Sequence, residues 1–233
     1  VFRIGEQVTE VLDLHYPEMT REEKKERVLN MLELVGIANK EGVYDMYPHE
    51  LSGGMRQRIC IAIALACNPQ LIIADEPTTA LDVTIQAQIL DLLENLKEKL
   101  NSSIMLITHD LGVVAGMADY VVVMYAGRVV EKGTTEDIFH HPSHPYTIGL
   151  MNSKPVVGKK VEELYNIPGN VPNPVEMPDY CYFRDRCEMH CEGCSGAYPP
   201  EIRISDTHVV SCYRYIDSGT VLGNPKSVNV EEL

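Results

Sequence analysis

The apolar residues near the start of the chain recur at helical spacing. Residues 1–14 predict an amphipathic helix, because their apolar positions fall on one face. Those positions are Ile4, Val8, Val11 and Leu12. The charged run 21–27 leads into a second apolar periodic segment, and it is typical of a solvated helix face with i, i+4 pairs. We therefore expect a helical and charged region up to about residue 49.

Strands and helices alternate in the middle of the chain. The predicted strands cover residues 71–74, 103–108, 120–124 and 128–130. The first is wholly apolar, which is typical of a strand buried on both faces, and we expect the second to be buried too. The last two predict a hairpin around Ala126 and Gly127. A helix is predicted over 83–100, where helical spacing outweighs the β-branched first residues. This alternation predicts an α/β layered sheet.

The composition changes from about residue 138. Proline and glycine become frequent there, and five of the seven cysteines follow Tyr180. This tail has too little apolar material for a large core of its own, so we expect a staple or a bound metal to hold it. The predicted division is a helical subdomain, an α/β core and a cysteine-rich extension, over residues 1–50, 51–137 and 138–233.

Charge and hydropathy narrow the classes of function. The formal net charge of −14 argues against a protein that binds nucleic acid, which would show a basic patch. The chain has no tryptophan and three phenylalanines, so no platform for stacking bases stands out. Its longest apolar runs fall short of the roughly 20 residues that a membrane helix needs. We expect a soluble chain that reaches a membrane only through a partner.

A serine and two glycines directly precede a predicted helix. Ser52, Gly53 and Gly54 come before an apolar helix expected over residues 57–67. Backbone N–H groups left uncovered at the positive end of a helix form an anion site. An ordinary Ser/Gly helix cap explains the same residues, and the stretch alone leaves both interpretations open.

Polar side chains follow the two predicted buried strands. Asp75 and Glu76 end the first strand, and Thr108, His109 and Asp110 end the second. Ligands of open α/β sheets bind at this carboxyl edge. There the first acid can hold Mg²⁺ through its water shell, the second can orient or deprotonate a water, and the imidazole can reach a phosphate. A solvated loop and a structural histidine are the alternative explanations.

Four motifs in this order resemble those of the ABC-type ATPases. Residues 51–58 resemble the signature motif, 71–76 the Walker B strand with its catalytic glutamate, 80–82 the D-loop, and His109 the switch histidine. The resemblance implies a P-loop ATPase fold, with a parallel-sheet core plus a helical subdomain, and two ATPase subunits that pair head to tail around ATP.

The resemblance also implies a role for each matching residue. Glu76 and His109 would be catalytic, and Asp75 would serve Mg²⁺. The other residues implied to contact ATP or the dimer interface are Ser52, Gly53, Gly54, Gln57 and Asp82. The signature residues would meet the γ-phosphate of ATP held by the opposite subunit.

One motif of that family is missing from the sequence. No Gly-x-x-x-x-Gly-Lys-Ser/Thr loop occurs, and the Gly158-Lys159 pair lies in the tail. Without that loop no lysine and no amide nest grip the β- and γ-phosphates. The Q-loop of the family is also absent. We therefore interpret Val1 as a cut edge, expect the missing third upstream in the intact subunit, and expect no ATP hydrolysis by this polypeptide alone.

The tail points to one branch of the family. Importers of oligopeptides, dipeptides and nickel use two unlike ATPase subunits. This chain resembles the first of them at residues 78–88, at residues 141–147 and at Met55. The resemblance implies a second ATPase subunit and two integral membrane permease subunits as partners, and a substrate-binding protein indirectly. The subunit would sit at the cytoplasmic face of the cell membrane, and residues 1–49 resemble its permease-contacting subdomain. The alternatives are a soluble ABC-type ATPase of a non-transport complex, as in phosphonate metabolism, and a natural non-catalytic partner.

The tail cysteines follow the spacing Cys181-x5-Cys187-x6-Cys194-x17-Cys212, with Cys191 in addition. Spacing alone leaves structural zinc and an iron–sulfur cluster open, and a reducing compartment disfavours disulfides. The importer resemblance implies a [4Fe-4S] cluster on the four spaced cysteines, with a structural role, and Zn²⁺ as the alternative. Two further cysteines, Cys60 and Cys67, are expected as small core residues.

Overall fold

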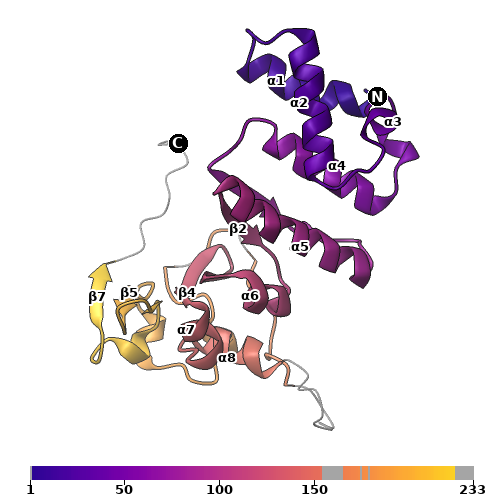
Figure 1. The fold of residues 1–233 in the computed structure, drawn as a ribbon. Helices are drawn as coiled ribbons and strands as arrows, with labels where there is room; N and C mark the ends of the chain where they lie inside the picture. Colours follow the sequence, from indigo (N-terminus) through magenta and orange to yellow (C-terminus); the bar gives the residue numbers. More distant parts are fainter. Residues whose placement is uncertain (1, 154–164, 174, 178, 224–233) are drawn as a thin grey trace. The chain divides into compact units, whose positions relative to one another are not determined.

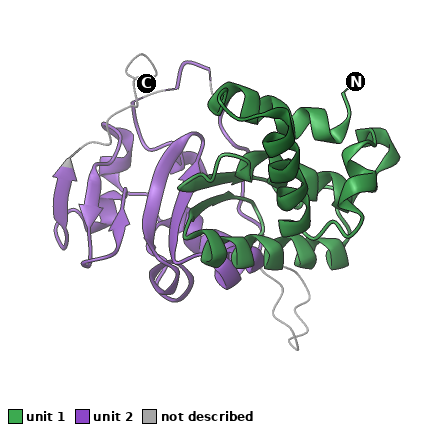
Figure 2. Ribbon diagram, turned by 45° about the horizontal axis from the view of Figure 1, so that its top comes forward, with its two compact units in different colours: residues 1–111 green, residues 112–233 purple. Residues whose placement is uncertain are grey.

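The computed structural model describes residues 2–153, 165–173, 175–177 and 179–223. Val1 and the Gly158-Lys159 pair lie outside these residues. The chain forms two compact units, residues 1–111 and 112–233 (Figure 2). The predicted domain boundaries at residues 50 and 137 separate regions with different expected functions, and they stay a prediction. In the part of the chain that the structure describes, we find no helix that combines the length and the apolar character of a membrane span.

The first unit begins with a group of packed helices (Figure 1). They are α1 (Ile4–His15), α2 (Arg21–Leu34), α3 (Lys40–Tyr44), the short 3₁₀ turn η1 (Pro48–Glu50) and α4 (Gly53–Leu65). The apolar face predicted for α1 is buried at Ile4, Val8 and Leu12, which confirms the helical spacing. The expectation of a solvated charged run is wrong at Lys24, which is buried and whose ammonium group donates to Asp13 at 2.7 Å.

Two parallel strands and a long helix complete the first unit. Strand β1 (Leu71–Asp75) pairs with β2 (Ser103–Ile107), and α5 (Val83–Leu100) connects them. The expectation that both faces of β1 are buried is wrong, because its side chains alternate and Ile73 is 63% exposed. Strand β2 alternates in the same way. The apolar run of β1 therefore buries one face and leaves the other open.

The two cysteines of the first unit are not core residues. Cys60 is exposed on α4, and Cys67 is half-buried beyond the end of that helix. The prediction that both are small core residues is therefore wrong. The buried face of α4 is formed by Ile59, Ile61, Ala62 and Leu65, and position 60 points away from it.

The second unit is built on a five-stranded sheet of order β3-β4-β6-β5-β7. Its elements are α6 (Leu111–Met117), β3 (Tyr120–Tyr125), β4 (Arg128–Thr134), α7 (Thr135–His140), α8 (Pro145–Asn152), the 3₁₀ turns η2 (Arg184–Arg186), η3 (Glu192–Ser195) and η4 (Tyr213–Tyr215), β5 (Glu201–Arg203), β6 (Val209–Val210) and β7 (Thr220–Gly223). The predicted hairpin is confirmed, and its turn residues Ala126 and Gly127 have φ of 47° and 79°. Positive φ at both positions suits a two-residue hairpin turn.

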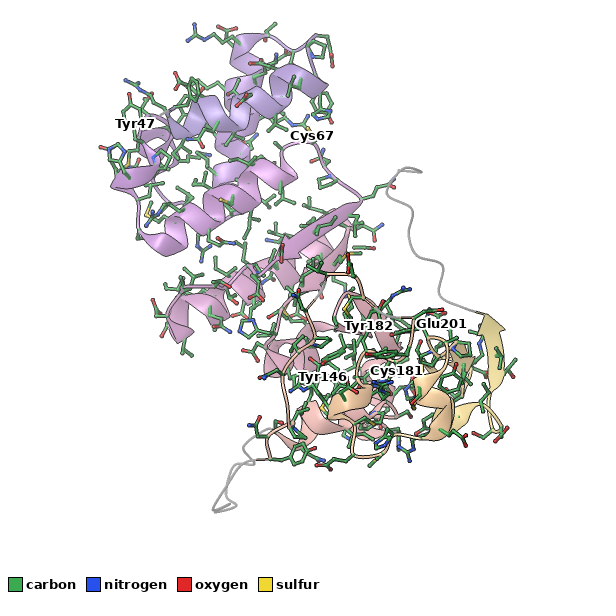
Figure 3. The ribbon with its side chains drawn as sticks, turned by 180° about the vertical axis from the view of Figure 1, so that it is seen from behind. Tyr47, Cys67, Tyr146, Cys181, Tyr182 and Glu201 are labelled. Carbon is green, nitrogen blue, oxygen red and sulfur yellow. The ribbon has the colours of Figure 1, made fainter. Side chains whose placement is uncertain are left out.

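The tail shares its core with this hairpin instead of building one alone. Tyr125, Val130 and Phe183 form a buried cluster, and Tyr146 and Cys181 pack against it (Figure 3). The rings of Tyr125 and Phe183 meet edge to face at 5.2 Å between centroids. The hairpin therefore supplies two of the three buried residues of the cluster on which the tail packs.

A buried carboxylate joins three segments of the second unit. Glu131 of β4 accepts hydrogen bonds from the backbone N–H groups of Ser143 and His144 at 2.6 and 3.0 Å. Its Oε1 also lies 2.7 Å from Nε2 of His208, and the two side chains are 0% and 4% exposed. Since buried charges are tolerated only when paired and hydrogen-bonded, these contacts fix the turn before α8 and the start of β6 against β4.

Replacing this carboxylate should destabilise the second unit. Glu131→Ala leaves two buried N–H groups and His208 without an acceptor, so we expect a loss of about 3–5 kcal/mol in the free energy of unfolding. Urea unfolding followed by circular dichroism measures it. The control is Glu136→Ala, which removes an exposed i, i+4 contact with His140 and should leave the midpoint unchanged. Equal midpoints for the two variants would contradict this account.

Candidate nucleotide site

The ends of β1 and β2 bring a carboxylate and an imidazole into contact. The parallel register pairs Asp75 with Ile107, and the N–H of Glu76 donates to the carbonyl of Ile107 at 2.9 Å. Glu76 Oε1 then lies 2.8 Å from His109 Nδ1, with the two side chains 37% and 85% exposed. The sequence predicts that these two side chains lie at the same sheet edge, and in the structure they contact each other directly.

The backbone turns sharply directly after β1. Glu76 has φ of 47° and Ala80 has φ of 62°, a region that non-glycine residues rarely adopt. Thr79 Oγ1 donates to Glu76 Oε2 at 2.9 Å, so the second carboxylate oxygen is also held. Strained backbone of this kind clusters at functional sites when the surroundings impose it. Thr79 was not predicted as a site residue. A Ser or Thr hydroxyl three residues after a sharp turn can nevertheless donate to a neighbouring side chain or backbone group.

Both members of the pair have shifted pKa values. The hydrogen bond from His109, followed by that from Thr79, lowers the pKa of Glu76. The hydrogen bond to Glu76 and its charge raise the pKa of His109. Each group therefore favours the charged form of the other, and near neutral pH Glu76 is a carboxylate able to accept a proton.

The first acid at this edge is Asp75, the last residue of β1. In the described ranges no group of three or more His, Cys, Asp or Glu side chains is arranged to hold a metal ion. Mg²⁺ is usually held by one or two carboxylates together with waters and substrate phosphates, not by an all-protein cage. A single carboxylate at the end of a strand therefore fits Mg²⁺ that arrives with a nucleotide.

The Ser-Gly-Gly stretch forms the first turn of α4. The helix begins at Gly53, so the expected start at Gln57 is wrong by about one turn. The reason is the cap, because Ser52 Oγ accepts the N–H of Met55 at 3.3 Å. Gln57 lies one turn further along and is half-buried. Since the first N–H groups of a helix have no intrahelical acceptor, the amides of Gly53 and Gly54 are available to an anion.

Of these two glycines, Gly54 allows α4 to lie close to α5. A Cβ on Gly54 would stand 2.7 Å from Cγ2 of Ile85, and one on Gly53 would stand 3.5 Å from Leu81. Asp82 caps α5 by accepting the N–H of Ile85 at 3.0 Å. The signature and D-loop residues are thus packed together in the first unit. Sequence reasoning missed Ile85 as a contact of the signature, because its spacing marks it only as an apolar helix position.

The tail cysteines lie in one neighbourhood. Cys194 and Cys212 are buried, and Cys181, Cys187 and Cys191 are half-buried. Burial raises the pKa of Cys212 to about 12, and the charges of Cys181, Cys194 and Cys187 add to the shift. Cys191 and Cys194 are in direct contact, with 3.3 Å between their sulfur atoms. The described residues hold no closed set of metal ligands here either.

Comparison with known proteins identifies the family. The family model "ABC transporter" matches residues 3–79, and "Oligopeptide/dipeptide transporter, C-terminal region" matches residues 130–194. The oligopeptide transport ATP-binding protein AppD of Bacillus subtilis is 49% identical over 94% of this chain and 66% of its own length. This chain belongs to the oligopeptide/dipeptide branch of the ABC transporter ATP-binding proteins. The predicted resemblance is therefore confirmed.

Further relatives of the ABC family agree. OppD of Salmonella typhimurium is 49% identical over 92% of this chain and 64% of its own length. The dimeric structure of a bacterial ABC transporter cassette matches with a TM-score of 0.51 and 32% identity, over 58% of this chain and 57% of that one. This match confirms the predicted ABC-type α/β fold. The chain spans less than two thirds of the length of these two curated relatives.

Removing the carboxylate should change the titration of the histidine. The ordinary pKa values are 4.5 for Glu76 and 6.5 for His109. At a pH between these two values both groups are charged, so the ion pair is fully formed. It weakens as pH rises through the raised pKa of His109, or falls through the lowered pKa of Glu76. In Glu76→Gln we expect the pKa of His109 to fall, as measured by NMR of the imidazole ring protons.

The control for this titration is Glu50→Gln. Glu50 accepts the backbone N–H of Tyr47 at 2.7 Å, so its loss should leave the titration of His109 unchanged. A pKa of His109 that is equal in the native chain and in Glu76→Gln would show that the contact is not made in solution.

Proposed function

We propose that this chain forms part of the energy-coupling ATPase of an importer for oligopeptides or dipeptides. The observation that carries the proposal is the Glu76–His109 contact of 2.8 Å, made at the carboxyl edge of two parallel strands and directly after Asp75. Ligands of α/β sheets bind at this edge. The names of the relatives, which are oligopeptide transport ATP-binding proteins, support the choice of cargo.

Three side chains have separate roles in this proposal. Asp75 holds Mg²⁺ through its water shell, and the bound ion neutralises phosphate charge. Glu76, which is a carboxylate near neutral pH, orients the attacking water and accepts its proton. His109, exposed on one side and held by Glu76 on the other, donates to the γ-phosphate. These roles make hydrolysis depend on groups that the β1–β2 register brings together.

The signature residues act on a nucleotide held by a second ATPase subunit. The sequence has no Gly-x-x-x-x-Gly-Lys-Ser/Thr loop, so these 233 residues lack the lysine and the amide nest that hold the β- and γ-phosphates. Ser52, Gly53 and Gly54 present uncovered amides at the start of a helix, and Gln57 follows them. The dimeric form of the similar cassette supports the pairing of two ATPase subunits. The resemblance to the family implies that they pair head to tail with Asp82 at the interface.

The remaining partners follow from the same family. Two integral membrane permease subunits would contact the helices of residues 1–49, which places the chain at the cytoplasmic face of the membrane. An extracytoplasmic substrate-binding protein would act on it only through those permeases.

Loss of the signature serine should weaken nucleotide-dependent pairing. Ser52→Ala removes both the hydroxyl offered to the γ-phosphate and the cap of α4. We therefore expect roughly a tenfold or greater loss of association with the full-length second ATPase subunit of the importer, in the presence of a non-hydrolysable ATP analogue. Analytical ultracentrifugation with and without the analogue measures it, and the chain alone should show no ATP turnover.

The matched control is Thr20→Ala. Thr20 caps α2 by accepting the N–H of Glu23 at 3.3 Å, the same contact that Ser52 makes to Met55. The Thr20→Ala variant should lose a similar capping contribution of about 1 kcal/mol and keep its association with the partner subunit. Equal loss in both variants would contradict the role of Ser52. In pull-downs from detergent-solubilised membranes, co-purifying permeases support an importer, whereas their absence favours a soluble ABC-type ATPase.

We also propose that the extension holds a [4Fe-4S] cluster on Cys181, Cys187, Cys194 and Cys212. Four thiolates are the usual ligand set of such a cluster, so the donors fit in kind. The mutual effect of these thiols on the pKa of Cys212 supports their closeness. Binding would draw the thiols together from the arrangement described above and would fasten η3 and η4 to the loop before η2.

The metal content of the purified chain tests this part of the proposal. After purification without oxygen we expect about four irons and four acid-labile sulfides per chain. Cys212→Ser should lower the iron content, and Cys60→Ser, which removes an exposed thiol of the first unit, should not. Stoichiometric zinc without sulfide would overturn the cluster and leave the ATPase assignment standing.

A further inference from the structure

Two sulfur atoms of the tail face each other. Cys191 Sγ and Cys194 Sγ lie 3.3 Å apart, and both cysteines carry free thiols. The backbone N–H of Cys191 donates to the sulfur of Cys194 at 3.4 Å, and the carbonyl of Cys191 accepts the N–H of Cys194 at 3.0 Å. The turn η3 thus holds the two cysteines together, and the first of these bonds orients the sulfur of Cys194.

The turn that holds this pair is itself covered. A Cβ on Gly193 would stand 3.2 Å from the ring of Tyr213, so the glycine lets the ring lie against the turn. The hydroxyl of Tyr213 donates to the carbonyl of Ala197 at 2.9 Å, directly beyond the turn. The approach of the two sulfurs is therefore part of a packed arrangement.

The two thiols differ in their access to solvent. Cys191 is half-buried, whereas Cys194 is only 6% exposed. Cys191 is therefore the more accessible residue of the pair. We propose that Cys191 and Cys194 form a thiol-exchange site for small disulfides such as glutathione disulfide, with Cys191 as the entry thiol and Cys194 as the resolving thiol.

The reaction consists of two exchanges. The thiolate of Cys191 attacks one sulfur of glutathione disulfide, whose S–S bond breaks, and glutathione leaves with the proton released by Cys191. Cys194 then attacks the sulfur of Cys191, the mixed disulfide breaks, and a second glutathione leaves with the proton of Cys194. The cysteine pair loses two electrons and becomes a disulfide, and glutathione disulfide is reduced to two thiols.

This site does not depend on the proposed ATPase function. Cys194 is also one of the thiols assigned above to a cluster, so the exchange belongs to the metal-free chain. Its products are identified by peptide mass, whereas the cluster is tested by iron and sulfide content and the ATPase by subunit association. Each proposal can therefore fail without the others.

The test uses the whole chain, reduced and freed of metal with a chelator. It is equilibrated in glutathione buffers of increasing disulfide content, quenched in acid, alkylated, and digested with trypsin. The peptide of residues 187–203 holds Cys187, Cys191 and Cys194, and fragmentation between the first two assigns the bond. We expect the Cys191–Cys194 disulfide at roughly tenfold the yield of any pairing with Cys181, Cys187 or Cys212. If the native chain shows the same distribution of disulfide pairings as the urea-unfolded chain, the proposal is overturned.

Two single variants separate the roles of the thiols. Cys194→Ser should trap the mixed glutathione disulfide on Cys191, since no resolving thiol remains. Cys191→Ser should leave Cys194 unmodified, because its sulfur is buried. Cys60→Ser is the control and should form the Cys191–Cys194 disulfide as the native chain does. A glutathione adduct on Cys194 in Cys191→Ser, or none on Cys191 in Cys194→Ser, would reverse or remove the assigned roles.

Discussion

The site in the first unit depends on the register of two parallel strands. Because β1 and β2 pair so that Asp75 stands opposite Ile107, the residues that follow both strands emerge at the same edge. The bond from the N–H of Glu76 to the carbonyl of Ile107 continues this ladder by one residue, and His109 then comes within 2.8 Å of the carboxylate. A slip of one residue would turn the side chains of one strand to the opposite face and separate the pair. Sheet pairing brings the two strand ends together, and the sharp turn at Glu76 then completes the geometry on which hydrolysis would rest.

Close packing near the start of α4 adds a second constraint. The absence of a Cβ at Gly54 admits Ile85, so the first turns of α4 and α5 lie against each other. Ser52 and Asp82 cap these two helices with the same kind of contact, a side-chain oxygen that accepts an N–H three residues on. The signature residues and Asp82 are thus held in one packed arrangement.

The second unit is organised around the buried carboxylate of Glu131. It receives two backbone N–H groups from the turn before α8 and faces His208 at the start of β6. Through these bonds the extension joins the hairpin of β3 and β4 and shares its aromatic cluster. The cysteine-rich loops pack on this scaffold, since Cys181 and Cys187 lie against the same aromatic cluster.

Much of this protein was determined by its sequence alone. Helical spacing and cap residues such as Thr20, Ser52 and Asp82 specify the helices, and Ala126-Gly127 specifies the hairpin turn, because these signals act over a few neighbouring residues. The order of the motifs also identified the family. Only the tertiary structure decided that Cys60 is exposed, that Lys24 is buried beside Asp13, and that β1 buries one face. It alone brought Glu131 to His208 and turned the sulfur of Cys191 toward Cys194. Local patterns specify periods and turns, whereas burial and distant contacts depend on which faces meet when the whole chain packs.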